Sequence, residues 1–112
     1  ESTKQNVLRF VEAGGIIALG DDYIEEEAPW YRLGMPIMEL KLLKEAGLTN
    51  MQIIVAATQN GSIVCGLDKE IGTIETGKRA DILIVEGNPL ENLDNISNVR
   101  MVIKEGHIIV ER

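Results

Sequence analysis

The stretch Ile16-Ile17-Ala18-Leu19-Gly20-Asp21-Asp22 runs from an apolar segment directly into two carboxylates. Four apolar residues in a row, without polar alternation, predict a short parallel strand that is buried on both faces. A carboxylate at the carboxyl end of such a strand lies where barrel enzymes have their catalytic residues. Asp22 is therefore the first candidate for a functional residue.

The chain supplies few partners for such a carboxylate. It contains one histidine, His107, and one cysteine, Cys65. Any metal or acid-base cluster around Asp22 must therefore draw on residues outside this chain. The sequence also opens without methionine and directly in a helical pattern. We therefore expect a piece of a longer enzyme.

A helix is predicted immediately before the strand. Apolar residues recur at helical spacing from Val7 to Val11, with Ser2 or Thr3 as the N-cap and Gly14-Gly15 as the stop. A helix, a glycine turn and a buried strand in this order are typical of an α/β repeat.

Further helices are predicted after the acidic segment 20–34. Pro36, a residue favoured at the first helical position, starts a helix that ends at Gly47. The segment Thr49-Asn50-Met51-Gln52 has the form of a capping box. It predicts a second helix from Met51 to about Gln59, and we expect this helix to bury Ile53, Ile54 and Ala57. A last helical turn is expected over residues 60–65.

The pattern changes to that of β structure after Gly66. Residues 71–74 and 80–85 are predicted as strands on either side of a turn at 75–78. Residues 99–103 and 107–110 are predicted as a hairpin around Glu105-Gly106, and residues 90–98 as irregular.

Composition excludes several classes of function. The net charge of −7 and pI near 4.7, without a basic patch, disfavour nucleic acid as a partner. The apolar runs are far shorter than the ~20 residues that cross a bilayer, so no membrane partner is expected. The polar N-terminus lacks a signal-peptide core, and the single Cys65, predicted as a small buried hydrophobe, fits a reducing cytoplasm.

The order of these parts resembles the carboxyl-terminal end of a metal-dependent amidohydrolase, in the imidazolonepropionase-like and prolidase-like branch. The resemblance extends over nearly the whole chain and is most specific in residues 72–85, where turn chemistry and strand pattern occur together. The other matching segments are residues 18–22, 39–49, 56–58, 66–67, 88–90 and the hairpin 99–110.

The resemblance implies an α/β fold built as part of a (β/α)₈ TIM-type barrel with a composite β-sandwich. Residues 1–66 would form the last barrel strand, its βα unit and helices, and residues 67–112 strands of the sandwich. Such a barrel needs about 250 residues. The isolated chain is therefore expected to hold no metal and to be inactive.

The resemblance also implies a site and a reaction. Asp22 would bind a divalent metal, usually zinc, and would shuttle a proton from the activated water to the leaving nitrogen. The substrate would be a small molecule with a C–N bond, in a cyclic amide, an amino-acid amide or a dipeptide. Family members commonly have threonine where this chain has Asp21. Alignment favours Asp22 over Asp21 as the ligand.

Alternative interpretations remain open for several residues. The acidic segment 21–27 suits either a solvated loop or a site for cations, and Trp30 and Tyr31 either line a pocket or pack across the barrel end. His107 is expected on the hairpin surface. Lys78 and Asp81 are expected to hold the turn and the start of the following strand.

A second hypothesis treats the chain as a non-catalytic module. A barrel strand without its neighbours leaves apolar surface uncovered, and such surface promotes a homo-oligomer or a domain-swapped assembly.

Overall fold

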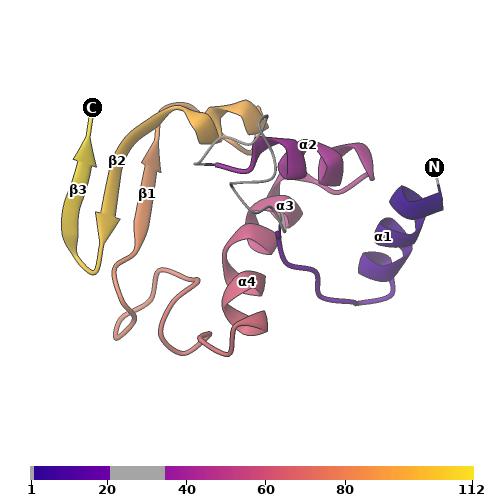
Figure 1. Cartoon of the computed structure of the whole chain (residues 1–112), viewed down its shortest axis with the longest axis horizontal. Helices are drawn as coiled ribbons and strands as arrows, with labels where there is room; N and C mark the ends of the chain where they lie inside the picture. Colours follow the sequence, from indigo (N-terminus) through magenta and orange to yellow (C-terminus); the bar gives the residue numbers. More distant parts are fainter. Residues whose placement is uncertain (1, 21–34) are drawn as a thin grey trace, which may run out of the picture.

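The computed structural model describes residues 2–20 and 35–112. Four helices come first and a small sheet follows, as Figure 1 shows with the sheet and α1 at opposite ends of the molecule. The helices are α1 (Ser2–Glu12), α2 (Ile37–Glu45), α3 (Asn50–Ala57) and α4 (Gln59–Val64), with a 3₁₀ helix, η1 (Leu93–Ser97). The strands are β1 (Ile82–Val85), β2 (Val99–Lys104) and β3 (His107–Glu111).

The core lies where α2, α3 and η1 meet. Its fully buried members are Leu40 on α2 and Ile53 on α3, and Ile96 of η1 closes it from the β-rich part of the chain. Val7, Leu8 and other partly buried residues pack against this cluster. Residues from both parts of the chain therefore share one small core.

The helix boundaries follow the local signals in the sequence. Thr49 and Gln52 form the predicted capping box, in which each side chain accepts a hydrogen bond from the other residue's backbone N–H. Gly47 follows Ala46, the C-cap of α2, and has a positive φ of 105°, as expected of a glycine that ends a helix. Within α3 the prediction that Ala57 is buried is wrong, because Ala56 takes that place with 0% exposure.

The predicted strand at residues 16–19 is absent from the described part of the chain. The segment is irregular, and Ile16 is 55% exposed instead of buried. A parallel strand is made by its neighbours, since its backbone groups pair with adjacent strands. No described strand lies beside this segment, so it forms no ladder.

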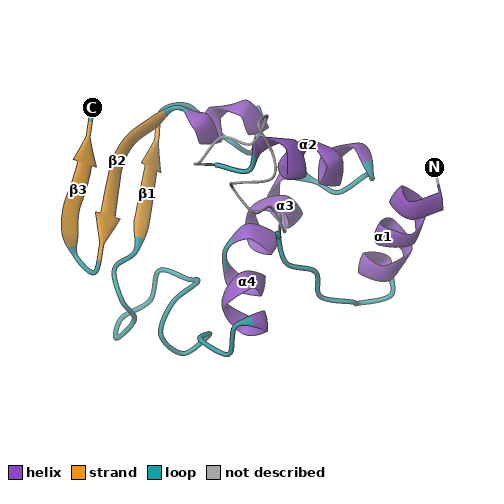
Figure 2. Ribbon diagram, in the orientation of Figure 1, coloured by secondary structure: helices purple, strands orange, loops and turns teal. Residues whose placement is uncertain are grey.

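The three strands form one antiparallel sheet in the order β1-β2-β3 (Figure 2). The predicted hairpin is confirmed, with Lys104 paired to His107 and Val102 to Val110. The prediction of a strand at 71–74 is wrong, since residues 71–73 form bends and residue 74 is irregular. Residues 93–97, expected to be irregular, form η1.

Apolar side chains are exposed on both faces of this sheet. Leu83 and Ile84 are neighbours on β1 and therefore point to opposite faces, yet each is 42% exposed. Ile108 and Ile109 on β3 repeat the pattern at 57% and 60%.

Cys65 is also exposed, contrary to prediction, because it follows the end of α4 outside the core.

None of the helices in the described residues has the length and apolar character needed to cross a bilayer.

Candidate functional site

The candidate carboxylate Asp22 lies outside the described residues, as do Asp21, the acidic segment 21–27, Trp30 and Tyr31. The structure does describe the segment that leads to Asp22, residues 16–20, and the helices that hold it. The geometry of the candidate site therefore begins with this segment.

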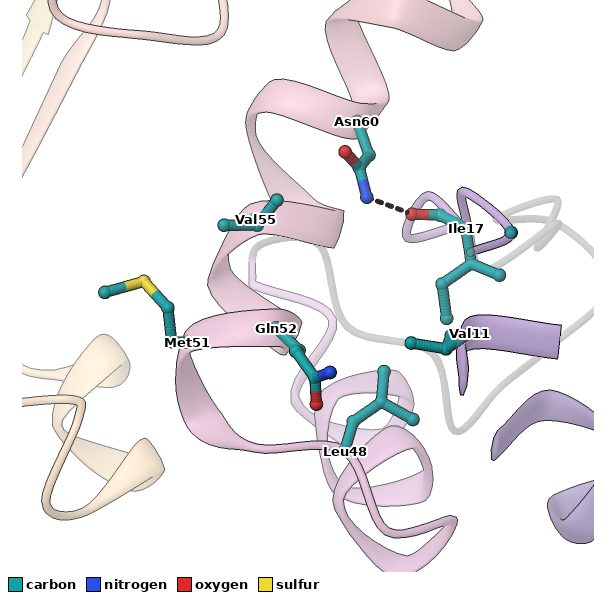
Figure 3. Close-up of a pocket in the computed structure, with 8 residues that line it drawn as sticks. Val11, Ile17, Leu48, Met51, Gln52, Val55 and Asn60 are labelled. Carbon is teal, nitrogen blue, oxygen red and sulfur yellow. Dashed lines mark hydrogen bonds between the residues drawn. The ribbon is translucent and has the colours of Figure 1, made fainter. Parts of the chain in front are cut away.

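Two hydrogen bonds attach the segment to α3 and α4. The backbone N–H of Leu19 donates to the carbonyl oxygen of Ala56 at 3.0 Å. The side-chain nitrogen of Asn60 donates to the carbonyl oxygen of Ile17 at 2.8 Å (Figure 3). Helical residues that are distant in sequence thus set the path of the chain toward Asp22.

The break between α3 and α4 explains why these groups are available. The last carbonyls of a helix have no partner within it, and α3 ends at Ala57. The carbonyl of Ile54 accepts from the Thr58 hydroxyl at 2.7 Å, whereas that of Ala56 accepts from Leu19. Thr58, at φ −125° and ψ −87°, interrupts the helix and places Asn60 in the first turn of α4.

A cavity of about 150 Å³ lies beside the segment. Six of its lining residues are apolar, and its two polar side chains are the amides of Gln52 and Asn60. Gln52 is already engaged in the capping box of α3. Since no lining residue is ionisable, this cavity lacks the groups for acid-base chemistry.

The described residues do not form a metal site. No group of three or more His, Cys, Asp or Glu side chains comes together in residues 2–20 and 35–112. His107 is exposed on the hairpin, as predicted. The described residues by themselves therefore do not supply the ligands for the divalent metal that the resemblance implies.

Lys78 has the structural role that the sequence predicted. Its side chain is 15% exposed, and its ammonium group donates to the carbonyl of Asp68 and to the Thr73 hydroxyl at 2.7 Å, beside the Glu75 carboxylate at 3.0 Å. Hydrogen bonds from Thr73 and then Lys78 lower the pKa of Glu75. Lys78 thus closes the turn before β1.

Asp81 holds the start of β1 against the hairpin. Its carboxylate accepts a hydrogen bond from the backbone N–H of Glu105 at 2.8 Å and another from Lys104 at 3.2 Å. The Glu105 hydrogen bond is the main cause that lowers the pKa of Asp81. This confirms the structural prediction for Asp81.

Reasoning from the sequence missed Asn60. The residue lies in Gln59-Asn60-Gly61, next to a glycine, and no motif marks it. A polar residue in the first turn after a helix break is the one local signal, and its target on Ile17 lies 43 residues away.

The chain matches the profile of the amidohydrolase family over residues 2–109. It is 31% identical over 106 residues to an imidazolonepropionase of Symbiobacterium thermophilum, covering 92% of this chain and 24% of that protein. An imidazolonepropionase of Thermoanaerobacter pseudethanolicus is 35% identical over 105 residues, covering 88% of this chain and 24% of that protein.

A solved structure of a Xaa-Pro dipeptidase with bound methionine superposes on 99% of this chain and 25% of its own, with a TM-score of 0.81 and 32% identity. The chain thus spans about a quarter of the length of the curated relatives it matches. Because the family profile extends over nearly all of its residues, this chain belongs to the amidohydrolase family, in the branch of imidazolonepropionase-like and prolidase-like proteins.

Proposed function

We propose that this chain is the carboxyl-terminal portion of a metal-dependent hydrolase that cleaves C–N bonds other than ordinary peptide bonds. The substrate is a cyclic amide, an amino-acid amide or a dipeptide. The observation that carries the proposal is the family match over residues 2–109, together with relatives about four times longer than the match. The imidazolonepropionases and the Xaa-Pro dipeptidase indicate the bond class.

In this proposal residues 1–66 complete a (β/α)₈ barrel and residues 67–112 contribute strands to a composite β-sandwich. Two features of the chain support this division. The segment 16–20 has no strand beside it in the described residues, and the sheet exposes apolar side chains on both faces. Both features indicate that further polypeptide covers this segment and this sheet in the complete protein.

Asp22 is our candidate for the catalytic residue and for a metal ligand of the complete protein, with zinc as the proposed divalent cation. The amidohydrolase superfamily is generally dependent on divalent metals, which supply a Lewis acid. The carboxylate of Asp22 accepts a proton from the attacking water and returns it to the leaving nitrogen. The remaining ligands come from residues outside this chain.

The test compares two neighbouring carboxylates in the protein that joins this chain to the rest of the barrel. We expect Asp22→Ala to lower kcat at least about 100-fold on X-Pro dipeptides or cyclic amides, because a positioned acid-base group contributes that much. Asp21→Ala is the matched control and keeps most of the activity. The chain by itself is expected to be inactive with Zn²⁺ added. Full activity of Asp22→Ala rejects the assignment.

A second candidate function is a non-catalytic module that associates with copies of itself. The exposed apolar side chains favour it, among them Ile16 at 55%, Ile74 at 83% and Ile109 at 60%. Light scattering on the purified chain tests this second proposal. A stable monomer contradicts self-association, and a defined dimer or tetramer supports it.

A further inference from the structure

We draw no further inference here: the strongest candidate, the open groove that charged residues of α2 and η1 line beside Asn50, carries nothing, because those charged side chains are exposed and the side-chain oxygen of Asn50, which has no hydrogen-bond partner among the described residues, is itself shielded from any ligand in the groove.

Discussion

The side-chain nitrogen of Asn50 lies 2.9 Å from the carbonyl oxygen of Leu90, and this hydrogen bond joins two residues 40 positions apart. The same nitrogen donates to Pro89 at 3.2 Å. Asn50 begins α3, whereas residues 89 and 90 belong to the turn after β1. One side chain therefore attaches the helical part of the chain to the β-rich part.

Replacement of Asn50 by alanine tests this attachment. Asn50 is 9% exposed, so the carbonyls of Pro89 and Leu90 would lose a partner in a site with little access to water. We expect a loss of about 1–3 kcal/mol in the free energy of unfolding, measured by chemical denaturation. The control is Asn98→Ala, at an exposed asparagine between η1 and β2, which should lower the free energy of unfolding by less. Equal losses in the two variants would contradict the role of Asn50.

Ile53 tests where the core lies. Its side chain is 0% exposed and packs with Leu40 and Ile96. Ile53→Ala should lower the free energy of unfolding by about 2–5 kcal/mol, because it removes buried methyl groups and leaves a cavity. The same substitution at Ile74, which is 83% exposed, should change stability by less than about 0.5 kcal/mol. A similar loss in both variants would show that the core is elsewhere.

Elements with local signals could be predicted from the sequence. The capping box of Thr49 and Gln52 needs only residues three apart, and the hairpin turn needs two residues at positive φ. Glu105 and Gly106 supply them, with φ of 49° and 82°. Such geometry is decided within a few residues, so the pattern in the sequence is sufficient.

Elements that depend on distant partners could not be predicted. Residues 16–19 have the composition of a buried strand, but a strand forms only beside another strand. The choice between Ala56 and Ala57 depends on how α3 is rotated against α2, which helical spacing alone does not fix. Cys65 is exposed because the core ends before α4, and its apolar neighbours gave no sign of that.

The same distinction between local signals and distant partners applies to the candidate site. Asp22 came from a strand-end pattern and a family resemblance, and its role remains a prediction. The contact of Asn60 could not be predicted, because its hydrogen-bond partner is a backbone carbonyl 43 residues away. Lys78 and Asp81 were assigned correctly, since the partners of Lys78 lie within ten residues and the turn and strand around both residues have strong local patterns.

Asp81 should make stability depend on pH. Its pKa is lowered, chiefly by the N–H of Glu105, so the carboxylate stabilises the fold above its ordinary pKa. That contribution is lost as the pH falls through the lowered value. We therefore expect Asp81→Asn to melt below the wild type at pH 7, with the gap closing in acid. Thermal unfolding across pH 2–7 measures this. A gap that is constant over this range would exclude a contribution from ionisation, and Glu111→Gln on β3 controls for the loss of one negative charge.

Two glycines in the segment 71–80 allow the cost of backbone strain to be measured apart from the cost of a steric clash. Gly72 and Gly77 have similar positive φ values of 96° and 91°. An added Cβ at Gly72 would lie 2.3 Å from the hydroxyl oxygen of Ser62, whereas at Gly77 nothing lies within 4 Å. Ser62 is 4% exposed, and its hydroxyl donates to the Gln59 carbonyl at 2.7 Å, so it has little freedom to move.

Gly77→Ala should therefore cost about 1–2 kcal/mol, the strain of an L residue at positive φ. Gly72→Ala carries the same strain and in addition forces Ser62 aside, which adds about 1–3 kcal/mol. Chemical denaturation of the two variants measures the difference directly. Equal stabilities would show that the loop moves freely over α4. The expected gap would show instead that Gly72 holds the loop against the helix on which Asn60 lies.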